Sequence, residues 1–379
     1  MASLDVSDLE NWVGKAIGGG NLRDPIHVND IRRWAQAMHN PHPLYFDEEY
    51  AQGSRFSQIV APQSFTVVCS DSHGAAPAVQ GRLEGTQMLF GGDEWWFGDG
   101  KSSAPRIFPG DSIRQERRFH DYSVKDTKFA GPTVFARGDT TYLNQRGETV
   151  AKQRSTAIRY QPEEARKRKN SKADEVEPEW SDAEKAALEE KKLAYYQSFR
   201  TLGHGRPKIE KGLKLATRPI GPHSALTFTT EWRAYLMNVW GAFRPDGLPT
   251  SLRQAGWLKE MDKNMEAAKV DPAEADGLYK GSSRGHAQPK YAQLIGLGRG
   301  YGYGASMGAW ILDYVSNWAG ESGEIVHAKL SYVAPAFTGD ATFVDGEVIE
   351  TGELVVVKVA MSNQKGAAVA SGTAEIRFV

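Results

Sequence analysis

The chain has 379 residues, of which 40% are hydrophobic and 25% charged, and its 46 Lys and Arg residues nearly balance 47 Asp and Glu residues. This composition describes a globular protein of about two domains and excludes a fibrous chain or one that overall charge directs to nucleic acid or anionic lipid. A single cysteine, Cys69, excludes an internal disulfide and a cysteine-based metal site. No apolar run reaches the ~20 residues of a transmembrane helix, and the N-terminus lacks a signal-peptide pattern, so we expect a cytoplasmic protein.

The first half is predicted to hold one short helix followed by strands. The helix is expected at residues 62–70, and the strands near residues 85–89, 111–120, 133–143 and 149–160. We assign residues 1–160 to an N-terminal domain.

A charged segment separates the two halves. Residues 161–190 are dominated by Lys, Arg, Glu, Asp and Ala. The basic run at 166–169 is flanked by acidic residues without interleaved aromatic residues, which favours a solvated linker face over a nucleic-acid site. A helix is predicted after Ser181, a residue that can cap its N-terminus. We assign residues 161–214 to this charged linker and helix.

The second half, residues 215–379, is predicted to contain a longer helix. Met307, Trp310, Ile311, Tyr314 and Trp318 recur at helical spacing within residues 305–318. Strands are predicted at 324–333, 341–349, 354–361 and 367–379, and the alternation of apolar and polar residues is clearest in the second and third of them. A helix followed by antiparallel strands indicates an α+β fold, in which a curved sheet wraps around a central helix.

The two halves share a pattern that indicates duplication. Each ends with a glycine, a Val-Ala pair and an Ile-Arg-aromatic triplet, at 147, 150–151 and 158–160 and again at 366, 369–370 and 376–378. A Gly-Asp pair also precedes a predicted strand in each half, at 110–111 and 339–340. We therefore expect two copies of one fold rather than a short solenoid repeat.

The residues after the first predicted turn carry a family resemblance. Residues 40–45, Asn-Pro-His-Pro-Leu-Tyr, are followed by five residues and then by Ala51. This segment resembles the Asp-x-Asn-Pro-x-His signature of MaoC-like, (R)-specific enoyl-CoA hydratases and dehydratases, in particular duplicated members with an N-terminal FAS1-like dehydratase domain. The resemblance covers most of residues 20–160 and extends more loosely over the second half. It implies a double hot-dog fold, with each copy a curved antiparallel sheet around a central helix.

The family's chemistry explains its signature residues. An Asp and a His transfer protons during hydration of an enoyl thioester, and backbone N–H groups at the start of the central helix bind the developing enolate oxygen. In the first copy Asn40 stands at the Asp position, His42 at the Asn position and Tyr45 at the His position. An amide is no base, and a phenol with a pKa near 10 is a poor proton donor at neutral pH. The first copy therefore departs from a standard hydratase site, although Asn40, His42 and Tyr45 stay candidates.

The second copy supplies the better candidate for the histidine of the family. His286 precedes Ala292 by the same spacing that separates Tyr45 from Ala51. The position of the expected Asp is Gly281, so Asp276 or a carboxylate from elsewhere would have to act as the base. The resemblance implies oxyanion or substrate-binding roles for Tyr303, Gly304 and Ala305 at the start of the predicted helix, and Ser64 is a further substrate-binding candidate in the first copy.

The resemblance implies a lyase that hydrates or dehydrates an enoyl-CoA or related acyl thioester, and the many aromatic residues suggest a bulky or ring-containing acyl group. Two alternatives stay open, an acyl-CoA thioesterase on the same fold and a non-catalytic acyl-thioester-binding subunit whose partner supplies the Asp and His. We expect no metal, no cofactor beyond the coenzyme A of the substrate, no nucleic-acid or membrane partner, and a homo-oligomer.

Overall fold

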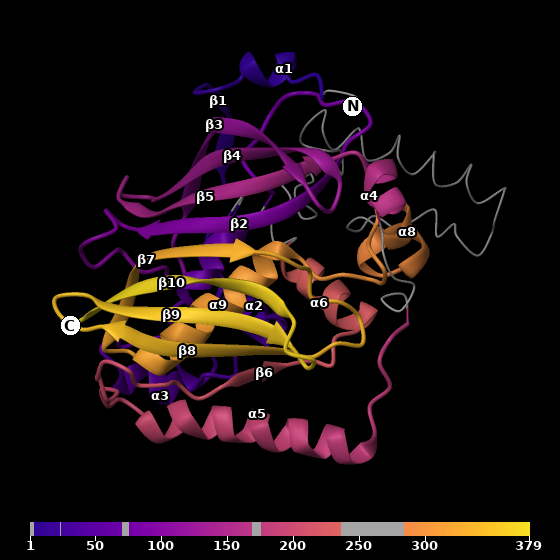
Figure 1. Ribbon diagram of the computed structural model, residues 1–379. Coiled ribbons are helices and arrows are strands. Elements are labelled where there is room, and N and C mark those ends of the chain that lie inside the picture. The colour runs from indigo at the N-terminus through magenta and orange to yellow at the C-terminus, as the bar shows by residue number, and fades with distance from the viewer. Residues whose placement is uncertain (1–3, 23, 70–75, 169–175, 236–283) are drawn as a thin grey trace, which may run out of the picture.

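A computed structural model describes residues 4–22, 24–69, 76–168, 176–235 and 284–379 (Figure 1). Ten strands form one antiparallel sheet in the order β1-β3-β4-β5-β2-β7-β10-β9-β8-β6. The strands are β1 (Ala16–Asn21), β2 (Gln87–Phe97), β3 (Ile113–Thr127), β4 (Gly131–Asn144), β5 (Thr149–Tyr160), β6 (Arg218–Ile220), β7 (Gly323–Tyr332), β8 (Thr342–Glu350), β9 (Val355–Asn363) and β10 (Ala368–Phe378). The helices and 3-10 turns used below are α2 (Val28–Ala37), η1 (Pro43–Tyr45), α3 (Glu48–Gly53), η2 (Gln63–Val68), α4 (Pro162–Arg168), α5 (Asp182–Leu202), α6 (Ala225–Tyr235), η4 (Arg284–His286), α8 (Pro289–Leu294) and α9 (Gly304–Ala319).

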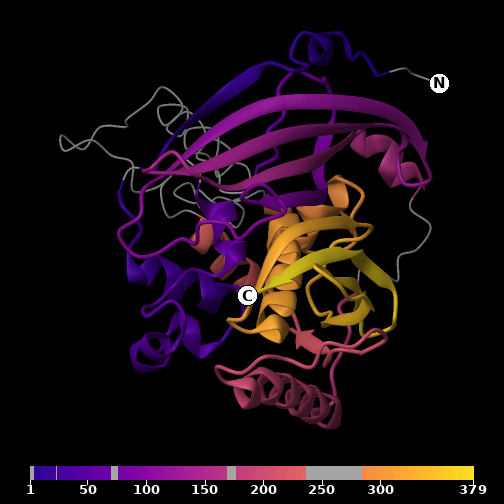
Figure 2. The same ribbon diagram turned by 90° about the vertical axis from the view of Figure 1, so that its left-hand side faces the viewer.

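The strand order is symmetric about the junction of β2 with β7. Outward from that junction the first copy supplies β2, β5, β4, β3 and β1, and the second copy supplies β7, β10, β9, β8 and β6. The two half-sheets join where residues 92–96 pair with residues 327–331. Figure 2 shows the strands of the first copy arching over the upper part of the molecule, while α9 stands beneath them beside β7 to β10. This topology is that of the expected α+β double hot-dog fold.

A repeated side-chain bond marks the duplication at atomic detail. In the first copy Gln145 Nε2 donates to Asp111 Oδ1 at 2.7 Å. In the second copy Gln364 Nε2 donates to Asp340 Oδ1 at 2.9 Å. In both copies the Asp belongs to the Gly-Asp pair noted in the sequence, and the Gln lies in the hairpin turn that precedes the last strand. In each copy this contact therefore links the hairpin before the last strand to the residue that precedes the equivalent earlier strand.

The central helix of the second copy, α9, lies where the apolar periodicity predicted it. Nearly all its residues are buried, including Met307, Trp310, Ile311 and Tyr314. A helix that is apolar on all sides belongs inside a protein, and α9 packs against β7, β10 and β2 as well as η2.

The first copy differs from the prediction of a helix at residues 62–70. Its described residues form the six-residue 3-10 helix η2 instead. The side chain of Gln63 bonds the backbone of Ile325 in both directions, donating at 2.8 Å and accepting at 2.9 Å. The β-branched residues Thr66, Val67 and Val68 also disfavour a regular α-helix. Contacts with the second copy thus fix this segment as a short turn.

The helix predicted after Ser181 is present as α5. Ser181 and Glu184 form a capping box at its N-terminus. Tyr195 and Phe199 are buried on its inner face, and the helix lies along the lower edge of the molecule against β6 and α9 (Figure 1). The 161–214 segment is therefore partly a packed structural element. Among the described residues, none of the helices has the length and apolar character needed to cross a membrane.

Candidate active site

The site is built on the first turn of α9. Tyr303 is the N-cap residue and its side chain makes no capping hydrogen bond. The first N–H groups of a helix have no acceptor within the helix, and the helix dipole adds positive potential there. Residue 304 has to be glycine, because a Cβ at this position would lie 2.5 Å from Cβ of Phe90 on β2. The turn at Tyr303, Gly304 and Ala305 is thus packed against the first copy, and no side chain of the described residues caps it.

His286 lies directly on this turn. Its ring stacks on that of Tyr303 with 4.0 Å between the centroids, and lies 4.2 Å from that of Tyr301. Nδ1 is 2.5 Å from the carbonyl oxygen of Tyr301. A carbonyl oxygen only accepts, so Nδ1 carries the proton and Nε2 keeps its lone pair. Burial lowers the pKa of His286 to about 4, and the imidazole is therefore neutral at pH 7, with Nε2 unprotonated.

A carboxyl group that sequence reasoning missed lies at the same helix start. Glu231 on α6 is fully buried, and within the described residues its oxygens find no hydrogen-bond partner of standard geometry. Burial raises the pKa of Glu231 to about 8, and the Ser306 hydroxyl of α9 partly offsets that rise. The same hydroxyl is 2.6 Å from the hydroxyl of Tyr235. At pH 7 this carboxyl is mostly protonated and can donate a proton.

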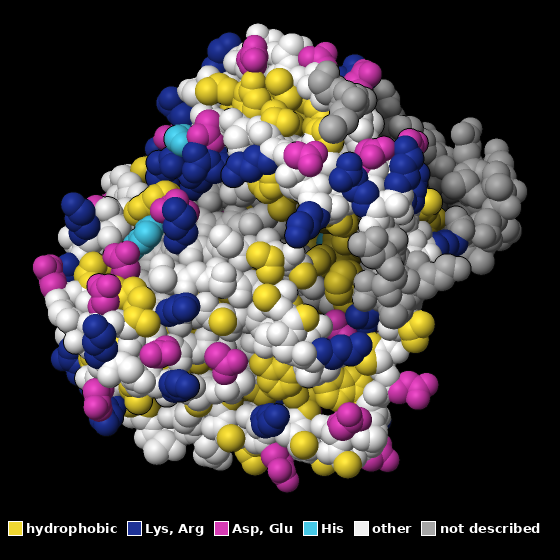
Figure 3. Space-filling view, in the orientation of Figure 1, with side chains coloured by type: hydrophobic (Ala, Val, Ile, Leu, Met, Phe, Trp, Pro, Cys, Tyr) yellow, Lys and Arg dark blue, Asp and Glu magenta, His cyan; other side chains and the backbone are white. Residues whose placement is uncertain are grey.

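Aromatic rings surround these groups. Trp232, next to Glu231 in the chain, stacks on Tyr303 at 5.9 Å, and Tyr235 meets the same ring edge-on at 5.7 Å. His286 and Tyr303 are only half-buried. Figure 3 shows hydrophobic side chains gathered in a hollow of the surface near α6 and the end of β7. The helix start, a neutral imidazole and a protonated carboxyl therefore share one aromatic environment that reaches the surface.

The first-copy candidates lie elsewhere, around Asp313 in the middle of α9. Ser64 donates to Asp313 Oδ1 at 2.6 Å and accepts from Trp34 Nε1 at 3.0 Å. Burial raises the pKa of Asp313 to about 6. Burial also raises the pKa of Tyr45 well above its usual value, and the nearby Asp313 carboxylate adds to that rise. Asp313 lies nine positions beyond Gly304 along α9, roughly 13 Å at 1.5 Å per residue. Ser64 and Tyr45 are thus not brought to the turn that holds His286.

Asn40 and His42 have structural partners in the same loop. Asn40 Oδ1 accepts from Asn317 Nδ2 at 3.1 Å and from the backbone N–H of His42 at 3.4 Å. His42 Nδ1 accepts from the backbone N–H of Leu44 at 3.2 Å, which caps η1. Burial lowers the pKa of His42 to about 4. These contacts give the loop between α2 and α3 its shape, and the catalytic assignment of both residues stays a prediction.

A sequence signal for Glu231 was present. Phe228, Glu231, Trp232 and Tyr235 recur at three- and four-residue spacing, so the acid lies on the apolar face of its helix. Gly281, which stands at the position of the expected Asp, and Asp276, a candidate to replace that Asp, lie outside the described residues. Within the described part of the chain, no group of His, Cys, Asp and Glu has the arrangement of a metal site.

Comparisons with known proteins agree with this architecture. Residues 11–153 match the family described as FAS1-like, dehydratase domain region. A protein of Thermomonospora curvata described as a "probable enoyl-CoA hydratase alpha subunit" is 32% identical over 163 residues, which cover 41% of this chain and 51% of that protein. The chain thus aligns with about half the length of this curated relative.

Solved structures share the fold over nearly the whole chain. A MaoC-like dehydratase superposes with a TM-score of 0.59 at 15% identity and covers 98% of this chain and 100% of its own. A MaoC-like dehydratase from Phytophthora capsici gives a TM-score of 0.54 at 10% identity, covering 99% and 98%. A conserved hypothetical protein of Mycobacterium tuberculosis with a double hotdog fold gives 0.50 at 11% identity, covering 98% and 97%.

The class of protein is therefore an α+β double hot-dog protein. More particularly, residues 11–153 match the FAS1-like, dehydratase domain region, and over nearly its whole length the chain shares the fold of solved MaoC-like dehydratases. The resemblance seen in the sequence is confirmed at this level.

Proposed function

We propose that this chain hydrates an enoyl thioester, or dehydrates its 3-hydroxy product, at the first turn of α9. The observation that carries the proposal is that His286 and Glu231 both lie at this turn, the imidazole neutral with Nε2 unprotonated and the carboxyl mostly protonated. Hydration needs one base and one acid, and these two groups supply them although the Asp of the family signature is absent.

His286 is assigned the role of base. Its Nε2 removes a proton from a water molecule as the water oxygen forms a bond to the β-carbon of the substrate. The hydrogen bond from Nδ1 to the Tyr301 carbonyl oxygen holds the ring in the required tautomer and stabilises the imidazolium that forms.

Glu231 is assigned the role of acid. The electron pair of the double bond moves toward the thioester carbonyl, and the α-carbon then takes the carboxyl proton of Glu231. A proton transfer from the imidazolium to the carboxylate restores both groups. The pKa of about 8 keeps the carboxyl protonated at neutral pH, which is the state that an acid needs.

The first turn of α9 is assigned the role of binding the enolate oxygen. Backbone N–H groups at an uncapped helix start, reinforced by the helix dipole, stabilise the negative charge that develops there. Tyr303, Gly304 and Ala305 are thus the substrate-binding residues, and this role does not extend to Ser64, whose hydroxyl is held by Asp313.

The substrate is proposed to be an acyl-CoA with a bulky or ring-containing acyl group. Stacked and edge-on rings of Trp232, Tyr235 and Tyr303 form the surroundings of the site, and such surfaces favour flat or ring-containing groups. Coenzyme A enters as part of the substrate, and no other cofactor takes part in the proposed steps.

One experiment tests this function. The purified chain is assayed for hydration of a series of aliphatic and aryl enoyl-CoA thioesters, with His286→Ala and the matched variant His120→Ala, whose histidine lies on β3 beside Asp121 and Asp139. His286→Ala should lose about 100-fold or more in kcat/KM, while His120→Ala keeps the wild-type value. Product analysis separates hydration from thioester hydrolysis, the thioesterase alternative.

The non-catalytic alternative has one observation in its favour, since the curated relative is described as an alpha subunit. If that alternative holds, the isolated chain binds the thioester without converting it, and activity appears only with a second subunit. Turnover by the isolated chain excludes it. A homo-oligomer and a cytoplasmic location are part of the proposed function and are tested by solution mass and by fractionation.

A further inference from the structure

Ser306 and Tyr235 form a buried pair of hydroxyl groups at the start of α9. Ser306 is the third residue of α9 and Tyr235 belongs to α6, and their hydroxyl oxygens are 2.6 Å apart. Both side chains are buried. The ring of Tyr235 meets Trp34 of α2 edge-on at 5.4 Å and Tyr303 edge-on at 5.7 Å. These rings hold the phenol at the hydroxyl of Ser306.

Glu231 lies one helical turn before Tyr235, so the two side chains share one face of α6. The carboxyl is fully buried, and its oxygens have no hydrogen-bond partner of standard geometry among the described residues. Burial raises the pKa of Glu231, and the hydroxyl of Ser306 acts against that rise. Ser306 therefore lies within reach of both the carboxyl and the phenol.

The hydroxyl pair can be oriented toward the carboxyl in one way only. A hydroxyl has one hydrogen to donate, and a carboxylate can only accept. If Ser306 gives its hydrogen to Glu231, the bond between Ser306 and Tyr235 needs the phenol as donor. Burial raises the pKa of Tyr235 well above its ordinary value, and Glu231 adds to the rise. The phenol therefore keeps the proton that this role needs.

Other titratable groups face the pair from neighbouring elements. They are Tyr303 at the start of α9, His286 of η4, which stacks on Tyr303, and Asp93 of β2, which raises the pKa of Tyr235. From α2 the uncharged ring of Trp34 meets Tyr235. Among the described residues, Ser306 is the one whose hydrogen bond acts on the pKa of Glu231.

We propose that Ser306 is a positioning residue for Glu231. Its hydroxyl donates to the carboxylate that remains once Glu231 has given its proton to the α-carbon, while Tyr235 donates to Ser306. This role rests on the proposed function of the site. The hydrogen bond is loose while the carboxyl is protonated and tightens as negative charge develops, so it stabilises the state after proton transfer more than the state before it.

The test follows the carboxyl of Glu231 directly, by infrared titration of its protonated C=O stretch in the full chain without substrate. The band is identified by its loss in Glu231→Gln. Ser306→Ala should move the midpoint of this titration upward by about one to two pH units, because a hydrogen bond to a charged group is lost. Tyr235→Phe should move the midpoint less, in the same direction. Ser306→Thr keeps the hydroxyl and should stay close to the wild type.

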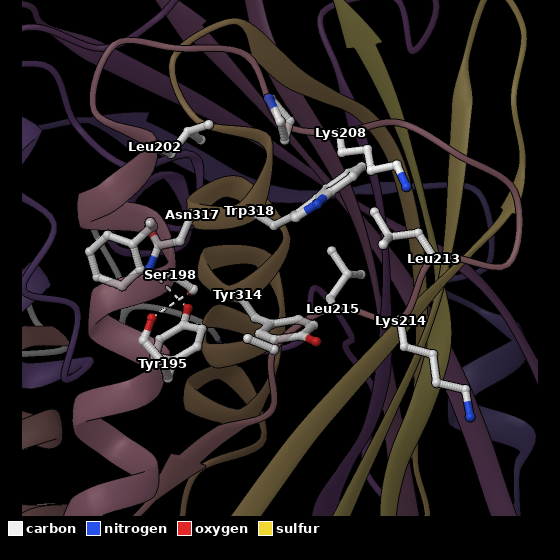
Figure 4. A pocket seen from close by; sticks show the side chains of 13 residues that line it. Tyr195, Ser198, Leu202, Lys208, Leu213, Lys214, Leu215, Tyr314, Asn317 and Trp318 are labelled. Carbon is white, nitrogen blue, oxygen red and sulfur yellow. Dashed lines mark hydrogen bonds between the residues drawn. The ribbon is translucent and has the colours of Figure 1, made fainter.

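A matched control deletes a buried hydroxyl near the opposite end of α9. Figure 4 shows Tyr195 of α5 there, and its hydroxyl accepts from Asn317 Nδ2 at 3.0 Å. Asn317 is eleven positions beyond Ser306, roughly 16 Å along the helix. Tyr195→Phe should therefore leave the midpoint of Glu231 unchanged.

Kinetics with an enoyl-CoA thioester links this contact to the reaction. In Ser306→Ala kcat should fall about tenfold, while the affinity for the thioester stays within a few-fold of the wild type. The alkaline limb of kcat/KM should move upward together with the infrared midpoint, because both report the ionisation of Glu231.

The proposal is overturned if Ser306→Ala, folded by its melting curve, keeps the wild-type midpoint, or if Tyr195→Phe shifts the midpoint as much. Should Ser306→Ala fail to fold, an unchanged midpoint in folded Tyr235→Phe overturns it instead. A shifted midpoint in a chain that hydrates none of the thioesters supports the contact between Ser306 and Glu231 and contradicts the proposed function.

Discussion

Ser64 of the first copy donates a 2.6 Å hydrogen bond to Asp313 of the second copy, in the middle of α9. The bond joins the two copies at a buried carboxyl whose other oxygen, Oδ2, has no hydrogen-bond partner among the described residues. Burial raises the pKa of Asp313 to about 6, from an ordinary value of 3.8. The folded protein therefore binds this proton more tightly than the unfolded chain does between pH 4 and 6.

The first prediction concerns the pH dependence of stability. Because the folded-state pKa of Asp313 is raised, its contribution to the free energy of unfolding falls as pH rises from 4 to 6, by about 3 kcal/mol for a two-unit shift. Asp313→Asn keeps an acceptor for Ser64 and cannot ionise, so it should gain stability relative to wild type over this window. Chemical denaturation at pH 4, 5, 6 and 7 measures the difference. Asp126→Asn, on an exposed part of β3, is the control, and a constant difference for Asp313→Asn would contradict the prediction.

The second prediction concerns Asn40 and Tyr45. Asn40→Ala and Tyr45→Phe should change kcat by less than about tenfold, well under the 10²–10⁴-fold that removal of an acid or base causes. The reason is that Tyr45 is buried away from the α9 start with a raised pKa, and an amide cannot act as a base. Steady-state kinetics on folded variants decides the matter. A loss of 100-fold in Tyr45→Phe would move the active site into the first copy.

The third prediction concerns the pH dependence of turnover. With the pKa of His286 at about 4 and that of Glu231 at about 8, kcat/KM for hydration should be flat between these values. It should fall below the lower value as the base gains a proton and above the higher one as the acid loses its proton. A profile that rises through pH 8 would show that Glu231 is not the acid.

The fourth prediction concerns Gly308, on the face of α9 that meets the junction of the two half-sheets. A Cβ here would lie 2.4 Å from the hydroxyl of Tyr332, which donates to Asp93 at 2.8 Å. Gly308→Ala should therefore cost about 1–3 kcal/mol, the range for overpacking. In a Tyr332→Phe background the cost should shrink, because the clashing atom is gone. Equal costs in both backgrounds, measured by denaturant titration, would contradict this packing.

The sequence predicted the second copy closely and the first copy less well. The strands of the second copy and the helix α9 lie within two residues of the expected bounds, and β4 and β5 of the first copy agree as closely. In contrast, β2 and β3 continue to Phe97 and Thr127, well beyond the ends expected at residues 89 and 120. The helix expected at 62–70 is a 3-10 turn because Gln63 and Ser64 bond the second copy. Such long-range contacts leave no trace in local spacing.

The proposed site could be predicted from the sequence only in part, because tertiary contacts that local spacing does not show bring its residues together. The spacing of His286 to Ala292 predicted the histidine that the proposed mechanism uses, and the family resemblance implied the oxyanion role of Tyr303, Gly304 and Ala305. Both roles stay predictions. The sequence analysis did not assign Glu231 to the site, because only the tertiary packing of α6 brings it there. Glu231 lies more than fifty residues before His286 in the chain. Ser64 was expected at the substrate, whereas its hydroxyl is held between Trp34 and Asp313.

The central claim is that a protonated Glu231 delivers the proton to the α-carbon beside His286. The most direct test is kcat/KM of Glu231→Gln for enoyl-CoA hydration at pH 7, together with the dissociation constant of the thioester. We predict a loss of about 100-fold or more in kcat/KM with substrate affinity within a few-fold of wild type. A folded Glu231→Gln variant with wild-type turnover would contradict the claim.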